Sequence, residues 1–250
     1  MRFSVGYATD VGRKRAQNQD SFAAVPELGL FIVADGMGGH RGGETASAMV
    51  ADVVPAKMKA AAGNTKQDPH DALAESIKSA NAAIHKRAAQ DPSLQGMGTT
   101  TTALLFRNES LIIGHVGDSR CYFFRPSSIW QITRDHSLVQ EKLRAGLITR
   151  EQAKTDRMKN VITRSVGYEP GVEVDLYDMP VLPGDVFLLC SDGLSGMVED
   201  GQILETVQKC VIDGNDPKRA VDELVDMANR NGGDDNVTVV IIKVLGSNGG

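Results

Sequence analysis

The chain has 250 residues, of which 41% are hydrophobic and 24% are charged, and this composition is typical of a globular protein with a sizeable core. Its net charge of −5 and the lack of a Lys/Arg block argue against a nucleic-acid partner. No segment approaches the roughly 18 apolar residues of a membrane span, and the odd number of cysteines argues against a disulfide framework. We expect a cytoplasmic monomer without a membrane partner.

Residues 1–25 are predicted to form a strand, a loop and a second strand. The loop holds a basic segment, 11–15, and is followed by the polar residues Asn18, Gln19 and Asp20. Arginine presents a planar set of donors that suits phosphate oxygens. The alternative is a basic loop that only contacts solvent.

The next segment is an apolar run, 30–34, that stops on Asp35 and continues into Gly36, Met37, Gly38 and Gly39. Such a run bounded by a turn signal predicts a buried strand. Glycines let the backbone approach a bound group closely, so Asp35 and the neighbouring carbonyls could bind a hard cation such as Mg²⁺ or Mn²⁺. An ordinary Asp-Gly turn is the alternative.

Two helices are predicted next, over residues 43–59 and 69–89. Pro55 is expected to kink or end the first, and Leu73, Ile77, Ala80 and Ile84 form a core stripe on the second. Strands follow, joined at Asn108-Glu109 by a hairpin turn. Ser137 is predicted to cap a helix. The segment 144–166 is mixed in charge and too long for a simple connection.

The pattern of a strand that ends on a carboxylate recurs along the chain. Apolar runs end on Asp118 and on Asp192, and the turn that contains Asp234 and Asp235 leads into a strand at Val237. Carboxylates gathered at one rim repel one another unless cations neutralise them. A metal cluster explains all of these positions together.

The C-terminal part is predicted to contain helices over 200–210 and 216–231 and a last strand over 237–244. Asp216, Pro217 and Gly232 are the expected start and stop signals of the second helix. No repeat or linker interrupts the chain, so we expect a single domain over 1–245 and a flexible tail over 246–250. Many short strands between helix pairs favour an α+β fold of two antiparallel sheets packed face to face, with helices outside.

Several motifs occur in an order that resembles the metal-dependent Ser/Thr protein phosphatases of the PP2C (PPM) family, in its bacterial form. They are Asp-Gly-Met-Gly-Gly-His at 35–40, Gly-Asp-Ser-Arg at 117–120, Cys-Ser-Asp-Gly-Leu at 190–194, Gly-Gly-Asp-Asp-Asn-Val-Thr at 232–238 and the segment from Arg15 to Phe22. The resemblance implies an αββα sandwich with metals at one rim. It also implies that 144–166 is a flap beside the active site.

The resemblance further implies a role for individual residues. Asp35, Asp192 and Asp235 would bind one Mn²⁺ or Mg²⁺, and Asp35 with the Gly36 carbonyl would bind a second. Asp118 would contribute to a third, weaker metal site. Arg15 would bind phosphate, with Arg13 as the alternative, and Asp20 would orient metal-bound waters.

The implied reaction is hydrolysis of phosphoserine and phosphothreonine in proteins by a water that two metals activate, without a covalent intermediate. Phosphorylated proteins, and a cognate Ser/Thr kinase, would be the partners. The cysteine phosphatases need Arg six residues after Cys, but Ser127, Gly196 and Asp216 stand at those positions.

Four alternatives stay open at this stage. The chain could be a catalytically silent pseudophosphatase that binds phosphoproteins or a kinase, or it could act on small phosphoesters. Asp118 could be a turn carboxylate paired with Arg120. His40 could be a proton donor or a histidine with only a structural hydrogen bond.

Overall fold

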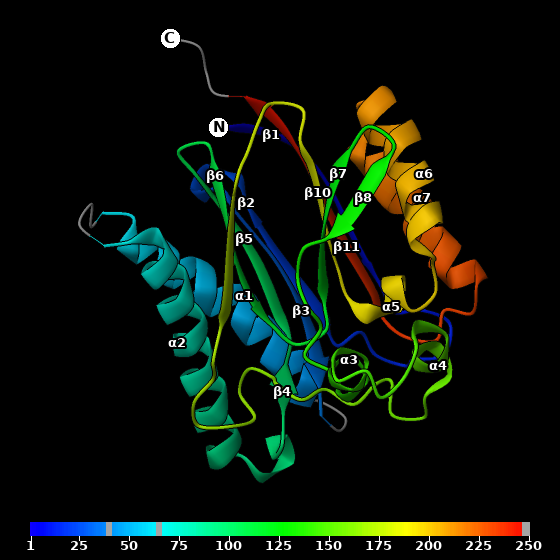
Figure 1. Ribbon diagram of the computed structural model, residues 1–250. Coiled ribbons are helices and arrows are strands. Elements are labelled where there is room, and N and C mark those ends of the chain that lie inside the picture. Colours follow the sequence, from blue (N-terminus) through cyan, green and yellow to red (C-terminus); the bar gives the residue numbers. More distant parts are fainter. Residues whose placement is uncertain (39–41, 64–66, 247–250) are drawn as a thin grey trace.

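The computed structural model describes residues 1–38, 42–63 and 67–246, and in this part of the chain two antiparallel β-sheets pack face to face with helices on both outer faces (Figure 1). The expected αββα architecture is therefore confirmed. No helix in the described ranges is long and apolar enough to cross a membrane.

The first sheet has the strand order β1-β11-β10-β7-β8, with all neighbours antiparallel. Its strands are β1 (Arg2–Asp10), β7 (Arg120–Arg125), β8 (Ser128–Gln131), β10 (Val186–Cys190) and β11 (Val237–Gly246). Every residue of β10 is buried because this strand lies in the middle of a sheet that is covered on both faces. The tail was expected to begin at Gly246, but Gly246 ends β11 and pairs with Arg2; residues 247–250 lie outside the described ranges.

The second sheet has the order β2-β3-β5-β6-β9, and the short strand β4 also pairs with β3. Its strands are β2 (Asp20–Val25), β3 (Leu30–Met37), β4 (Gly98–Thr99), β5 (Thr101–Arg107), β6 (Ser110–Val116) and β9 (Asp175–Pro180). The predicted hairpin at Asn108 and Glu109 joins β5 to β6, and both residues have positive φ angles, of 46° and 64°. The chain crosses from this sheet to the first one between β6 and β7.

Helices α1 (Gly42–Ala61) and α2 (Pro69–Gln90) cover the second sheet, while α6 (Asp200–Val207) and α7 (Pro217–Arg230) cover the first. Short 3₁₀ turns lie at Pro26–Leu28 and Pro92–Leu94. Helix α7 has the predicted Asp216 cap. Helix α6 ends earlier than expected, at Val207, and a π-helical turn follows over Gln208–Asp213.

Pro55 does not end α1, which continues for six further residues to Ala61. Proline removes one helical hydrogen bond. The buried face of Val50, Val54 and Met58 packs into the core on both sides of Pro55, and this packing holds the helix together across it.

Three apolar layers result from this arrangement: one under each helix pair and one between the sheets. The middle layer contains Phe31, Phe106 and Phe187, which pack edge to face. It fixes the position of one sheet on the other, and so also the position of the strand ends at the rim beside α3 (Leu138–Arg144), α4 (Arg150–Thr155) and α5 (Asp192–Ser195).

Candidate active site

The carboxylates at the strand ends converge on one rim of the sandwich. Asp20 lies directly opposite Asp35 in the β2–β3 pair, Asp192 follows β10, and Asp235 precedes β11. Asp118 lies in the connection between β6 and β7. Burial and then the negative charges of the other four, Asp20, Asp192, Asp118 and Asp235, raise the pKa of Asp35 well above its usual value. The five carboxyls therefore lie close enough at this rim for their charges to act on Asp35.

Three other carboxyls of this rim also hold protons more tightly than usual. Burial, opposed by hydrogen bonds from Ser191 and Thr238, raises the pKa of Asp20 to about 6. Burial and then the charge of Asp192 raise the pKa of Asp118 to about 8. Burial and then the charge of Asp235 raise the pKa of Asp192. Positive charge at the rim would be needed for all of them to ionise near neutral pH.

Glycines permit two close approaches of the backbone that bring the carboxylates together. A Cβ on Gly36 would lie 2.0 Å from the Gly43 carbonyl oxygen, and a Cβ on Gly193 would lie 1.9 Å from the Asn236 carbonyl oxygen. Gly193 follows Asp192, and Asn236 follows Asp235. The contact between these two turns therefore fixes the two carboxylates relative to each other.

The side chain of Asn236 binds the loop that follows β1. Its side-chain oxygen accepts a hydrogen bond from the Gln19 backbone N–H at 2.8 Å, and its amide donates to the carbonyls of Val11 and Gln17, both at 2.9 Å. Only its backbone N–H reaches Asp235 Oδ1, at 2.8 Å. The Asn236 side chain thus fastens the 11–19 loop, which carries Arg15, to the rim.

Arg15 is the arginine of this loop that reaches the carboxylates. One of its guanidinium nitrogens lies 2.6 Å from Asp235 Oδ2, and its side chain is 52% exposed. Arg13 instead bonds through its backbone N–H to the Gly233 carbonyl, at 2.7 Å. Between the two candidates for a phosphate ligand, the geometry favours Arg15.

The proposed pairing of Asp118 with Arg120 is wrong. The Arg120 guanidinium donates to both oxygens of Asp135, with distances of 2.7 and 3.1 Å to Oδ2 and 3.1 Å to Oδ1, and to the Tyr122 hydroxyl at 3.0 Å. It points to Asp135 because the chain returns beside β7 after β8. Among the described residues, Asp118 Oδ1 is buried without a hydrogen-bond partner, and so is Asp20 Oδ1.

These oxygens and the raised pKa values fit divalent cations with water in their coordination shells, because Mg²⁺ and Mn²⁺ prefer oxygen ligands and keep several waters. In the described ranges, no three His, Cys, Asp or Glu side chains are already grouped closely enough to enclose one ion. Asp235 Oδ2 is paired with Arg15 in this arrangement. Residues 39–41 lie outside the described ranges, and His40 is among them.

Comparison with known proteins gives the family. The family model described as "Protein phosphatase 2C" matches residues 10–237. The chain belongs to the protein phosphatase 2C family. It is therefore a metal-dependent protein serine/threonine phosphatase.

The phosphatase is similar over nearly its whole length to bacterial relatives. It is 37% identical over 245 residues to the serine/threonine phosphatase stp of Listeria innocua, which covers 95% of this chain and 94% of the relative. It is 39% identical to PstP of Mycobacterium tuberculosis, over 95% of this chain and 44% of that longer protein.

Solved structures of relatives agree with the fold. The PstP catalytic domain in complex with two manganese ions has a TM-score of 0.86 at 36% identity, with 98% of this chain and 99% of that chain covered. Stp1 of Staphylococcus aureus has a TM-score of 0.88 at 32% identity, with coverages of 98% and 96%.

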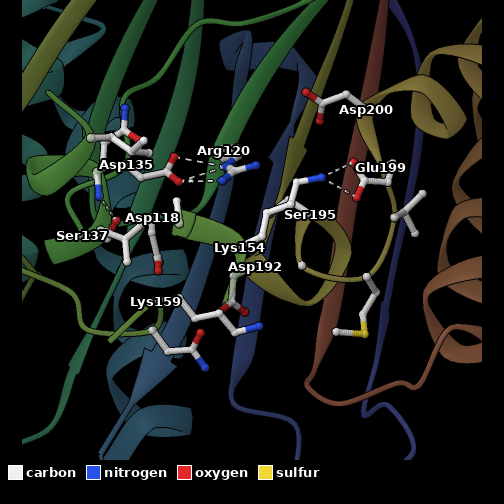
Figure 2. Close-up of a pocket in the computed structure, with 18 residues that line it drawn as sticks. Asp118, Arg120, Asp135, Ser137, Lys154, Lys159, Asp192, Ser195, Glu199 and Asp200 are labelled. Atoms are coloured by element: carbon white, nitrogen blue, oxygen red, sulfur yellow. Dashed lines mark hydrogen bonds and ion pairs between the residues drawn. The ribbon is translucent and has the colours of Figure 1, made fainter. Parts of the chain in front are cut away.

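A cavity of about 490 Å³ adjoins the rim of the phosphatase. Figure 2 shows Asp118 and Asp192 lining it, with the Lys154–Glu199 ion pair on another side. Lys154 lies on α4 in the 144–166 segment, and its ammonium lies 2.9 and 3.1 Å from the two oxygens of Glu199, at the start of α6. The family resemblance implied that this segment lies beside the active site, but the sequence did not point to Lys154, Lys159 or Glu199, because no local pattern joins residues 45 positions apart.

Proposed function

We propose that the carboxylate rim is the catalytic centre and that it hydrolyses phosphoserine and phosphothreonine in protein substrates. The placement of five carboxylates at one rim carries this proposal: Asp20 lies opposite Asp35 in the β2–β3 pair, and Asp118, Asp192 and Asp235 are near enough for their charges to act on Asp35. Asp35, Asp192 and Asp235 would hold one Mn²⁺ or Mg²⁺, Asp35 and the Gly36 carbonyl a second, and Asp118 a third, weaker one. Bound there, divalent ions supply positive charge and lower the pKa of water.

In this proposal, Arg15 acts on the substrate phosphate and Asp20 acts on the water. Arg15 is half exposed and long enough to exchange Asp235 for phosphate oxygens, which its planar guanidinium can hold in pairs. Asp20 accepts a hydrogen bond from the Ser191 hydroxyl on Oδ2, at 2.7 Å, so that Oδ1 is left to accept one from water. Asp20 would thus orient the attacking water.

A covalent route through cysteine has no support in the structure. Cys121, Cys190 and Cys210 are all buried. Burial raises the pKa of the Cys121 and Cys190 thiols, the latter to about 12, so neither is a thiolate near neutral pH. The proposed reaction is instead a direct, in-line attack of water on phosphorus, which the family resemblance implies and which needs no cysteine.

The test is hydrolysis of a phosphothreonine peptide with Mn²⁺, with and without a chelator, by the wild type and by Asp192→Ala. Turnover that needs the metal and disappears in the variant is the expected result. A folded, Mn²⁺-loaded wild type with no turnover on peptide or on aryl phosphates would leave the pseudophosphatase as the better description. Turnover on aryl phosphates alone would point to small phosphoesters.

We also propose that a cognate Ser/Thr kinase is among the phosphorylated substrates and that the phosphatase works as a monomer. Deletion of the phosphatase should raise the phosphorylation of one such kinase. Unchanged phosphorylation of every candidate kinase would contradict the kinase part of this proposal.

A further inference from the structure

The turn that carries Asp118 is held on both sides by two consecutive residues, Asp135 and His136. The Gly117 N–H donates to His136 Nδ1 at 3.0 Å, and the His136 N–H donates to the Gly117 carbonyl at 2.7 Å. Asp135 binds the guanidinium of Arg120 through both oxygens. We call Asp135 and His136 the 135–136 clamp.

The 135–136 clamp holds Asp118 in a buried position that is electrostatically unfavourable for a carboxylate. Asp118 is only 8% exposed, and its Oδ1 has no hydrogen-bond partner in the described ranges. A buried carboxylate without partners tends to turn toward solvent. The turn itself is constrained, because Gly117 has a φ of 108° and a Cβ there would lie 2.6 Å from Thr100 Cβ. The contacts that hold the Gly117 backbone therefore help to keep Asp118 in its buried position.

The hydrogen bonds define the tautomer of His136. A backbone N–H can only donate, so His136 Nδ1 is the acceptor and the proton is on Nε2. Nε2 then donates to Asp175 Oδ2 at 3.1 Å, and the other oxygen of Asp175 accepts from Arg164 at 2.5 Å. The side chain of His136 is 10% exposed, so this geometry is shielded from water.

The same residues lead into the 144–166 flap. The Thr163 N–H donates to the His136 carbonyl at 2.8 Å, and Arg164 follows it. The end of the flap is thereby tied to the histidine that holds Gly117. The bonds that hold the flap end and the bonds that hold Gly117 therefore meet at one residue, His136.

We propose that His136 is a positioning residue that holds the Asp118 carboxylate ready for a divalent cation and couples occupancy of that site to the flap. The proposal rests on the proposed function for the role of Asp118 as a metal ligand. His136 touches neither metal nor substrate in this arrangement. It acts through Gly117 on one side and through Asp175 on the other.

Two substitutions separate the two bonds of the ring. His136→Asn can keep an acceptor at the Nδ1 position but cannot reach Asp175, whereas His136→Gln can reach Asp175 but leaves the Gly117 N–H without its acceptor. The exposed His70, at the start of α2, supplies the control His70→Gln. Circular dichroism and the melting temperature show whether each variant is folded.

The main measurement is direct binding of Mn²⁺, followed by electron paramagnetic resonance of the free ion. For His136→Gln we expect the weakest site to lose about tenfold in affinity, as supporting partners of metal ligands typically do, with the tighter sites unchanged. In turnover, the half-saturating Mn²⁺ concentration should rise while kcat at saturating Mn²⁺ stays near the wild-type value. His136→Asn and His70→Gln should bind Mn²⁺ like the wild type.

The flap gives a second measurement, limited proteolysis within 144–166. Mn²⁺ at millimolar concentration should slow cleavage of the wild type but not of His136→Gln. If His136→Gln does not fold, Asp175→Asn replaces it, because an amide cannot accept from both His136 and Arg164 through separate oxygens, and it should uncouple cleavage from Mn²⁺. A wild-type Mn²⁺ isotherm in His136→Gln, equal losses in the Asn and Gln variants, or a flap that ignores Mn²⁺ in the wild type would overturn the proposal. Absent wild-type turnover would instead contradict the proposed function.

Discussion

Asp20 on β2 lies directly opposite Asp35 on β3, and after burial its charge is the largest cause of the raised pKa of Asp35. Two acidic side chains in a direct cross-strand pair are destabilising unless a proton or a cation lies between them. The metal-free phosphatase must use protons for this purpose. Cations that bind at the rim must therefore replace these protons.

The first prediction concerns pH and stability without metal. The folded-state pKa values of about 6 for Asp20 and about 8 for Asp118 lie above the usual value of 3.8, so the folded state binds more protons than the unfolded state between these limits. The two carboxyls therefore do not lower the free energy of unfolding below about pH 4. They lower it progressively as the pH rises through 6 and 8 and they lose their protons in the folded state. We expect the melting temperature in chelator to fall by about 5 °C or more from pH 5 to pH 8.5. Because Mn²⁺ binds the ionised groups, its stabilising effect should grow over the same range; a flat pH profile in chelator would contradict the prediction.

The second prediction concerns Asp118→Asn. Removing a buried carboxyl that repels Asp192 should raise the melting temperature of the metal-free protein at pH 8.5 and leave it nearly unchanged at pH 5, where the acid is protonated. The gain corresponds to about 1 kcal/mol. Thermal melts in chelator at both pH values measure it, and equal effects at the two pH values would show that charge is not the cause.

The third prediction concerns Arg15→Gln. Loss of the guanidinium should lower kcat/KM on a phosphothreonine peptide by about 100-fold, as removal of one donor to a developing charge typically does. Binding of Mn²⁺ should not weaken, since Asp235 is freed from its ion pair. Arg13→Gln is the matched control and should retain activity. Equal losses in the two variants would argue for a general effect of positive charge in the loop.

The fourth prediction concerns the turn contact between Gly193 and Asn236. Gly193→Ala puts a Cβ 1.9 Å from a backbone oxygen and should cost about 3 kcal/mol or more of the free energy of unfolding. Gly201→Ala, in α6, meets nothing within 4 Å and should stabilise the helix by about 0.5 kcal/mol. Urea denaturation in chelator measures both. A Gly193→Ala variant of wild-type stability would mean that the two turns can separate freely.

Local patterns in the sequence predict the strand ends, and with them most of the rim. The runs that stop on Asp35, Asp118 and Asp192 are contiguous, so burial and turn signals locate them without knowledge of the fold. The cap of α7 is local for the same reason. Their convergence was an inference from charge, and it agrees with the cross-strand pairing of Asp20 with Asp35 and with the effect of the other carboxylates on the pKa of Asp35.

Partners of individual side chains could not be predicted in the same way. Arg120 is closer in sequence to Asp118 than to Asp135, yet the return of the chain after β8 places Asp135 against it. The amide of Asn236 bonds to Val11, which is 225 residues away, because β1 and β11 are neighbours in the sheet. Such contacts depend on which strands pair, and a single sequence does not reveal that order. The turn of π-helix after Val207 also has no local signal that we could identify.

The rim draws its carboxylates from both halves of the sandwich. Asp20 and Asp35 belong to the second sheet, Asp192 and Asp235 adjoin strands of the first, and Asp118 lies where the chain passes between them. The layer between the sheets, which contains Phe31, Phe106 and Phe187, holds these halves against each other, and polar contacts such as the hydrogen bond from Ser191 to Asp20 join them at the rim. Metal affinity therefore depends on how the two sheets pack against each other. A substitution between the sheets that touches no metal ligand should therefore lower the affinity for metal before it lowers the content of secondary structure.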